Sequence, residues 1–80
     1  MKEFVWSTAD RARLKPGLQV LWRNETMQEW ATVTDHDPLI GVAGGVEFIY
    51  ARTPSGGAPF LKYCDPASLR EAEQEGKALR

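Results

Sequence analysis

Short segments in which apolar and polar side chains alternate are the feature that most constrains the fold of this chain. Apolar residues occupy every second position from Leu18 to Trp22, and again from Val46 to Tyr50. A period of two places alternate side chains on one face of a β-strand. Residues 30–34 add a third segment that is rich in β-branched and aromatic side chains, as strands prefer. The sequence therefore predicts a mainly β fold.

Turn-forming residues separate these segments. Polar residues, Gly and Pro concentrate at positions 24–29, 35–38, 43–45 and 53–59, where they favour turns and loops. We expect Phe60–Cys64 to be the closing strand. Residues 39–42 form either a short strand or an irregular arc, and in the second case the sheet is an open four-stranded meander with a C-terminal helix over one face.

Both ends of the chain carry helix signals. Thr8–Leu14 fits one or two helical turns capped by Ser7 or Thr8, and Pro16 and Gly17 would end them. Near the other end, Asp65 as N-cap and Pro66 at the first helical position predict a helix start over residues 65–70. Residues 71–80 are expected to be a helix or a mobile tail.

Size and charge limit the function classes. Eighty residues make one domain, here residues 1–80, and the net charge of −1 lacks the positive field that nucleic-acid binding needs. Residues 24–50 carry five acidic and no basic side chains, so the middle of the chain would repel phosphate. Binding of nucleic acid through Arg11, Arg13, Lys15 and Trp22 is therefore the weakest alternative, and a solvated basic face is the simpler interpretation.

The single cysteine and the lack of an apolar leader point to a cytoplasmic protein without a membrane span. Cys64 cannot form an internal disulfide, and only a short apolar cluster, Phe4–Trp6, follows the first residues. At this size one core supplies only a few kcal/mol, about 3–5. We therefore expect a homo-oligomer rather than a monomer.

Large rings are numerous for so short a chain. Alternation places Val20, Val33 and Phe48 in the interior, which leaves other rings for the surface. The predicted partner-binding residues are therefore two aromatic residues with the acids near them in the chain: Trp30, Tyr50, Glu29, Asp35 and Asp37. Such a cluster can hold a cation or a proline-rich segment. The alternative is that these rings pack in the core or in a subunit interface.

The order of the predicted elements resembles the small SH3-like barrels, among them Tudor-type and KOW-type modules. The matching stretches are Gly17-Leu-Gln-Val20, Trp30-Ala-Thr-Val33, Val46-Glu-Phe-Ile-Tyr50 and Pro66-Ala-Ser-Leu69. The resemblance covers roughly residues 16–70 and implies a barrel of four to five antiparallel strands, with a short N-terminal helical turn and a C-terminal helix or tail. It bears on fold more than on function.

A more distant resemblance is to the plasmid-type dihydrofolate reductases, small barrels borne on mobile gene cassettes. That family lines its tetrameric pore with a Val-Gln-Ile-Tyr strand. Here Val46–Tyr50 has one residue more and an acid in place of the amide, and Leu61–Cys64 keeps only the distance to the turn that follows. The sequence therefore lacks the motif that folate reduction requires.

Groups that usually carry catalysis or bind metals are scarce. His36 lies between two aspartates, but neighbouring side chains of an extended segment point to opposite sides, and zinc needs more His or Cys ligands than the distant Cys64 offers. We interpret His36 as part of a polar turn closed by Pro38, and Cys64 as a small buried hydrophobic residue. No cofactor, metal site or catalytic residue is predicted.

Two classes of function follow. The first is a non-catalytic binding or assembly module that recognises a protein or peptide partner through its aromatic and acidic surface. The second is a small-molecule-binding protein or enzyme whose site forms only at a homo-oligomer interface, because 80 residues rarely enclose a pocket of ~300 Å³.

Overall fold

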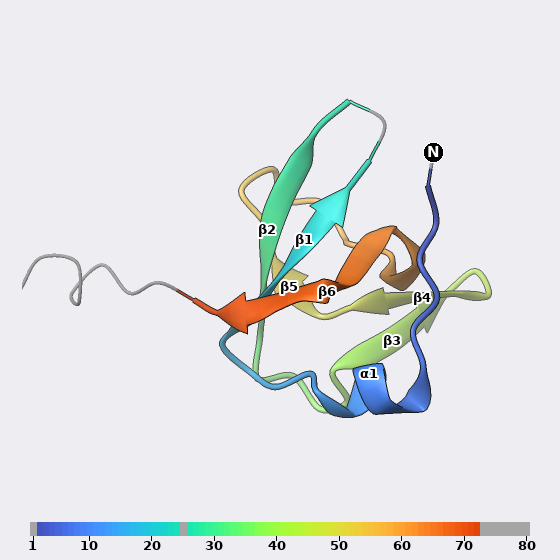
Figure 1. Cartoon of the computed structure of the whole chain (residues 1–80), viewed down its shortest axis with the longest axis vertical. Coiled ribbons are helices and arrows are strands. Elements are labelled where there is room, and N and C mark those ends of the chain that lie inside the picture. Colours follow the sequence, from blue (N-terminus) through green and yellow to red (C-terminus); the bar gives the residue numbers. More distant parts are fainter. Residues whose placement is uncertain (1, 25, 73–80) are drawn as a thin grey trace, which may run out of the picture.

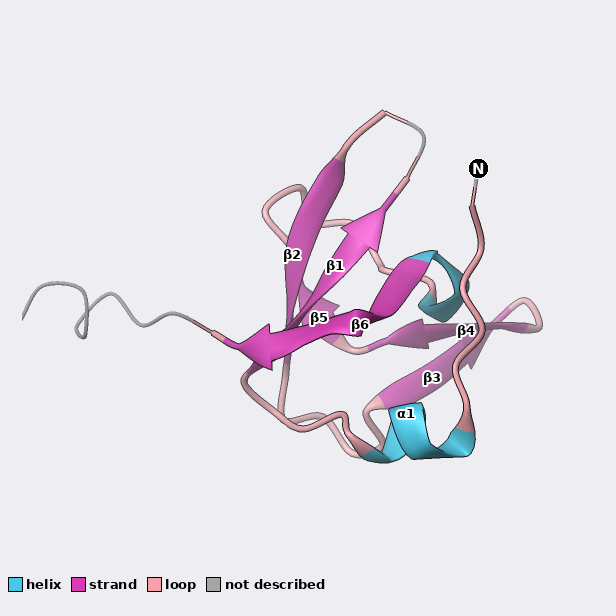
Figure 2. Cartoon of the chain, in the orientation of Figure 1, coloured by secondary structure: helices cyan, strands magenta, loops and turns pink. Residues whose placement is uncertain are grey.

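The computed structural model describes residues 2–24 and 26–72 and shows a mainly β fold (Figure 2). The first element is a short helix, α1 (Thr8–Ala12), and a 3₁₀ turn, Leu61–Tyr63, precedes the last strand. The strands are β1 (Leu18–Arg23), β2 (Gln28–Val33), β3 (Ile40–Ala43), β4 (Val46–Ile49), β5 (Ala51–Arg52) and β6 (Cys64–Glu71). The mainly β prediction is confirmed.

The strands form two antiparallel sheets (Figure 1). One sheet has four strands in the order β5-β2-β1-β6, and the other is the β3–β4 hairpin. An isolated bridge between Phe48 and Phe60 connects β4 to the segment before the 3₁₀ turn. Strand pairing does not close these sheets into one barrel within the described residues.

The N-terminal helix forms as predicted, with Ser7 as its cap. The Ser7 hydroxyl accepts a hydrogen bond from the Asp10 N–H at 3.0 Å, and the Asp10 carboxylate accepts one from the Ser7 N–H at 3.1 Å. This reciprocal pair satisfies two backbone donors that a helix start leaves free. The same bond from the Ser7 backbone lowers the pKa of Asp10.

Two predictions near the C-terminus are wrong. Phe60–Cys64 is not a strand, because residues 61–63 form a 3₁₀ turn, and residues 65–70 are not a helix but belong to β6. β6 pairs with β1 from Trp22↔Cys64 to Leu18↔Glu71, and the register shifts between Gln19 and Leu21.

That register shift explains how a strand accommodates the helix-start residues. Between the pairs Leu21↔Asp65 and Gln19↔Arg70, β6 has more residues than β1, so Pro66 lies in a bulge where no ladder N–H is needed. Inside the bulge, the Asp65 carboxylate accepts from the Ala67 N–H at 2.9 Å, and the Ser68 hydroxyl accepts from the Leu21 N–H at 2.7 Å. The side-chain chemistry expected of a helix cap therefore serves a bulge. Of the predicted helix or tail over residues 71–80, residues 73–80 lie outside the described residues.

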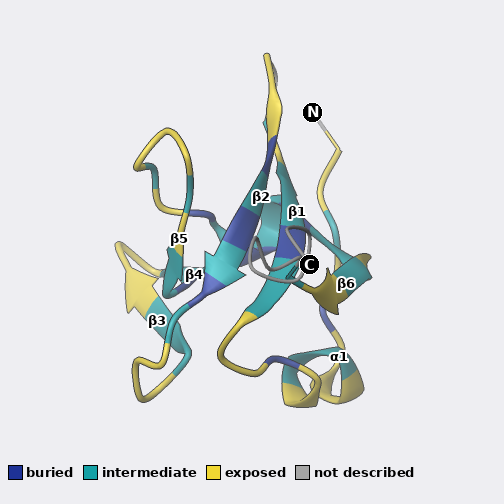
Figure 3. Ribbon diagram, turned by 90° about the vertical axis from the view of Figure 1, so that its left-hand side faces the viewer, coloured by how far each residue is buried: buried dark blue, intermediate teal, exposed yellow. Residues whose placement is uncertain are grey.

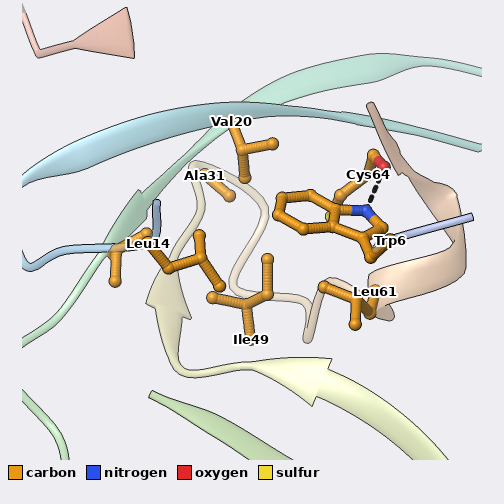
Figure 4. Close-up of a cluster of buried hydrophobic side chains, with 8 residues drawn as sticks. Trp6, Leu14, Val20, Ala31, Ile49, Leu61 and Cys64 are labelled. Carbon is orange, nitrogen blue, oxygen red and sulfur yellow. Dashed lines mark hydrogen bonds between the residues drawn. The ribbon is translucent and has the colours of Figure 1, made fainter. Parts of the chain in front are cut away.

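The core lies between the two sheets and the N-terminal segment (Figure 4). Its buried side chains come from segments spread between residues 6 and 64: Trp6, Leu14, Val20, Ala31, Val33, Ile49, Leu61 and Cys64. The predictions for Val20, Val33 and Cys64 are confirmed.

Phe48 does not fill the interior as predicted, because Ile49 does. Ile49 is 1% exposed, whereas Phe48 is half-buried on the other face of β4. Both alternating sets of this strand contain apolar residues, so periodicity alone could not decide which set faces inward. Of the two alternatives for residues 39–42, the structure shows a strand and not an irregular arc. β3 covers Ile40–Ala43, and Ile40 pairs with Ile49 in β4.

Candidate functional site

Three rings lie together beside the β3–β4 hairpin, and we call them the aromatic face: His36, Phe48 and Tyr50. The His36 and Tyr50 rings stack with centroids 3.6 Å apart and 13° between their planes. Phe48 meets Tyr50 edge-on with centroids 4.8 Å apart. The edge-on arrangement of Phe48 and Tyr50 is one that aromatic pairs prefer, whereas the His36 and Tyr50 rings lie face to face with little offset. The hairpin thus carries a partly exposed, ordered aromatic surface.

The hairpin positions these rings through its glycines. Gly44 and Gly45 form its two-residue turn with φ of +58° and +80°, a conformation that favours glycine and suits the twist of a tight hairpin. This turn sets the register that places Gly41 opposite Phe48. A Cβ on Gly41 would lie 2.8 Å from both the Phe48 and Tyr50 rings. Because Gly41 has no side chain, the two rings lie directly over β3.

Hydrogen bonds to two backbone carbonyls hold His36 against Tyr50. The Tyr50 carbonyl accepts from the Thr34 N–H at 2.9 Å and from the Thr34 hydroxyl at 3.0 Å. His36 Nδ1 lies 2.7 Å from the Pro38 carbonyl oxygen, and since a carbonyl only accepts, Nδ1 carries the proton. The polar turn predicted for residues 35–38 therefore orients an imidazole on the aromatic face.

Two acidic residues are the neighbours of His36 in the chain. Asp35 and Asp37 are exposed on either side of His36 in the chain, and within residues 2–24 and 26–72 neither forms an ion pair. Arg52, the basic residue next along the chain from Tyr50, is also exposed and does not pair with them in this part of the molecule. The two carboxylates are free to bind a cation from outside.

Of the five predicted binding residues, Tyr50 stacks on His36, and Asp35 and Asp37 are the neighbours of His36 in the chain. The other two, Trp30 and Glu29, lie elsewhere. Trp30 lies on β2, four residues before Thr34, the residue that bonds to Tyr50. Four residues of extended strand span ~13 Å, so Trp30 is far from Tyr50. Its ring stacks with the Arg70 guanidinium at 3.5 Å. Trp30 therefore belongs to the outer face of the four-stranded sheet.

Glu29 points to the opposite face of β2 and is buried, with 7% of its surface exposed. Its carboxylate accepts hydrogen bonds from the Ser55 N–H at 2.9 Å and the Ser55 hydroxyl at 2.7 Å. These bonds anchor the loop between β5 and the 3₁₀ turn. In the same loop Gly57 packs against Trp22, and a Cβ on Gly57 would lie 2.6 Å from the indole ring. Glu29 thus holds a loop in place.

A groove of about 390 Å³ lies between the N-terminal segment and β4, and the sequence does not predict that its lining residues form a site. Arg11 spans it with a two-point ion pair to Glu47, at 2.6 and 2.8 Å. The remaining lining is largely apolar: Phe4, Val5, Trp6, Gly45, Val46, Leu61 and Lys62. No short-range signal marks this groove, because Arg11 and Glu47 are 36 residues apart.

Cys64 and His36 do not form a catalytic pair. Cys64 is fully buried, and this burial raises the pKa of its thiol to about 12, so the nucleophilic thiolate is scarce near neutral pH. His36 is exposed and bonded to Pro38. Among the described residues, no group of three His, Cys, Asp or Glu side chains is arranged to hold a metal ion.

In the described part of the chain, no helix has the length and apolar character needed to cross a membrane. Comparison with family models, curated proteins and solved structures finds no match to this chain. Its function must therefore be inferred from the geometry of the aromatic face and its flanking carboxylates.

Proposed function

We propose that the protein is a non-catalytic binding module that captures a basic side chain of a protein or peptide partner. The site is the aromatic face together with Asp35 and Asp37. One observation carries the proposal: His36 stacks on Tyr50, and its two neighbours in the chain, Asp35 and Asp37, are exposed and form no ion pair among the described residues.

The chemistry of this surface suits a lysine or arginine. A cation over an aromatic ring at an exposed site gains ~0.5–1 kcal/mol, and an exposed ion pair gains a similar, salt-sensitive amount. Arginine has a further advantage because its planar guanidinium stacks on rings, as Arg70 does on Trp30. A single side chain therefore binds weakly, and longer partners must supply further contacts.

The finer fold and location belong to this proposal too. An SH3-like arrangement is supported by the short antiparallel strands and by the Phe48–Phe60 bridge, which connects β4 to the segment that leads into β6. A cytoplasmic setting is supported by the one free, buried thiol of Cys64, because a reducing compartment favours unpaired cysteine.

The test is a nuclear magnetic resonance titration of the labelled full chain with N-acetyl-lysine amide and N-acetyl-arginine amide. N-acetyl-citrulline amide, which has the shape of arginine without its charge, is the matched control. We expect amide shifts confined to residues 34–37 and 48–50 with the two cations, and none with citrulline. The double variant Asp35→Asn with Asp37→Asn should lose the response, while Glu3→Gln, at an exposed acid elsewhere, should keep it. Equal shifts with citrulline, or shifts centred on other residues, would refute the proposal.

The groove favours a second candidate, the binding of a small apolar anion by a single chain. Its volume of about 390 Å³ falls within the range of small-molecule sites, and Lys62 lies at its apolar wall. The probe is the dye 8-anilinonaphthalene-1-sulfonate. This candidate is supported if Lys62→Glu abolishes dye binding while Lys15→Glu leaves it intact. It is refuted if dye binding is unchanged in both variants.

A further inference from the structure

One edge of the β3–β4 hairpin has no partner strand. β3 pairs with β4 on one side, and within residues 2–24 and 26–72 no strand pairs with its other side. Figure 3 shows β3 at the outside of the molecule, with its second half exposed. A free edge offers a row of backbone donors and acceptors to another extended chain.

The hairpin register shows which groups face outward. Ala43 and Val46 flank the two-residue turn, and the Tyr50 N–H donates to the Leu39 carbonyl at 2.8 Å. In an antiparallel pair, hydrogen-bonded residues alternate with residues that point their backbone groups away. Leu39, Gly41 and Ala43 therefore bond to β4, while Ile40 and Val42 direct their N–H and C=O groups to the free edge.

Apart from the short length of β3, which has 4 residues, this edge lacks the features that usually prevent strand addition. Natural edges are protected by charged residues, prolines or bulges, yet residues 39–46 contain neither charge nor proline. The β3–β4 register runs without a shift. Val42 is 66% exposed. The edge is thus open, regular and apolar.

The aromatic face reaches toward the same edge. Because Gly41 has no side chain, the Phe48 and Tyr50 rings extend from the β4 side over β3. A strand added to β3 would run ~4.8 Å beyond it, so its side chain opposite Gly41 would approach these rings. Asp35 and Asp37 precede β3 directly in the chain. A basic side chain at that position would meet the rings, and the acidic residues just before β3 favour a positive charge in the partner.

We infer that the partner binds as an extended basic segment that adds an antiparallel or parallel strand to the free edge of β3. This inference rests on the proposed function and specifies how the partner is held. Backbone bonds to Ile40 and Val42 supply affinity, and the basic side chain at the aromatic face supplies selectivity. A second copy of β3 fits the edge less well, because it would bring no basic residue to Asp35 and Asp37.

The probe is a seven-residue peptide that alternates lysine with threonine and valine, titrated into the full chain by calorimetry. The matched control has the same sequence with its three central amides N-methylated, which keeps the lysine side chains and removes the backbone donors. We expect the control to bind roughly tenfold more weakly or worse, because two or more hydrogen bonds are lost.

Variants of β3 test the same contact from the protein side. Val42→Pro removes the outward N–H, at a position where the hairpin does not use it, and Val42→Ala keeps that N–H. Val42→Pro should weaken the parent peptide roughly tenfold, while Val42→Ala should stay within about threefold. Circular dichroism checks that each variant is folded. If Val42→Pro does not fold, the comparison of the parent peptide with its N-methylated control still tests strand addition.

The outcomes separate the two proposals. Equal binding of the parent and N-methylated peptides, with acetyl-lysine amide still shifting the aromatic face, overturns strand addition and leaves side-chain capture intact. Absence of binding by the parent peptide and by both single amino acids overturns both. Light scattering over a concentration series adds one more result: a dimer that Val42→Pro dissociates would show that a second copy occupies the edge, and would overturn the inference.

Discussion

Trp6 and Cys64 are 58 residues apart in the chain, and the Trp6 indole Nε1 donates a 2.8 Å hydrogen bond to the Cys64 carbonyl (Figure 4). Trp6 is 5% exposed, and nearby the Phe4 N–H donates to the Lys62 carbonyl at 2.7 Å. The bond therefore attaches the N-terminal segment to the start of β6 and covers one side of the core.

Truncation of Trp6 should destabilise the fold strongly. Trp6→Ala removes a buried indole and is expected to lower the free energy of unfolding by about 3–5 kcal/mol. Trp6→Phe keeps most of the apolar area but leaves the Cys64 carbonyl without its donor, for a loss of about 1–3 kcal/mol. Urea unfolding followed by circular dichroism measures both values. A loss of under about 1 kcal/mol in Trp6→Ala would contradict the buried role of this segment.

A side chain at Gly41 should disrupt the aromatic face. In Gly41→Val the new Cβ would lie 2.8 Å from the Phe48 and Tyr50 rings, so the rings must move, at a cost of about 1–3 kcal/mol. The proton shifts of His36, which depend on stacking over Tyr50, should change. Ala43→Val, at an exposed position of the same strand, is the control and should leave these shifts unchanged.

The Arg11–Glu47 ion pair should make stability depend on pH. The hydrogen bond from Arg11 lowers the pKa of Glu47 below its usual 4.5, so the folded state binds this proton less readily than the unfolded state. The pair therefore stabilises the fold above pH 4.5, and this contribution disappears as the pH falls through the lowered folded pKa.

A comparison of the wild type with Glu47→Gln isolates this effect. The wild type should be more resistant to urea at pH 7, and the difference should vanish at the most acidic pH where both remain folded. Because both side chains are partly exposed, added salt should also reduce the difference. A gap that does not change with pH would show that the pair contributes through packing and not through charge.

Cys64 should react only when the protein opens. Its thiol is buried, and burial raises its pKa to about 12, so both access and ionisation disfavour alkylation. We expect iodoacetamide to modify native protein very slowly at pH 8 and to modify it rapidly in urea. Ala9→Cys, which adds a thiol at an exposed position, should be modified once in native buffer. Rapid loss of both thiols in that variant would mean that Cys64 is accessible.

Loss of the Glu29–Ser55 contact should affect stability and not capture of a cation. Ser55→Ala leaves a buried carboxylate with fewer donors, which costs about 1–3 kcal/mol. The response of residues 34–37 and 48–50 to acetyl-lysine amide should persist, because Glu29 lies on the inner face of β2. A variant that stays folded yet loses this response would place Glu29 in the binding site after all.

Local features of the sequence determined much of the fold. The alternation from Leu18 to Trp22 predicts β1, a hydroxyl at Ser7 or Thr8 predicts the cap of α1, and two glycines predict the turn of the β3–β4 hairpin. Each of these depends on residues within a few positions of one another, where backbone preference and hydrogen bonding act directly. Part of the candidate site is local in the same sense, since Asp35, His36 and Asp37 are consecutive.

Contacts between distant segments decided the rest. Asp65 and Pro66 have the side chains of a helix start, but pairing with β1 makes the segment a bulged strand, because ladder bonds and burial outweigh a local cap. Ile49 rather than Phe48 enters the core, because the inner face of β4 packs with Val20 and Leu61. The alternation within β4 does not specify which of its faces is the inner one. Trp30 and Tyr50 both carry exposed ring surface, yet only the sheet arrangement separates them and brings Tyr50 to His36. Sequence alone determined which side chains can bind a cation, and only the tertiary structure decided which of them meet.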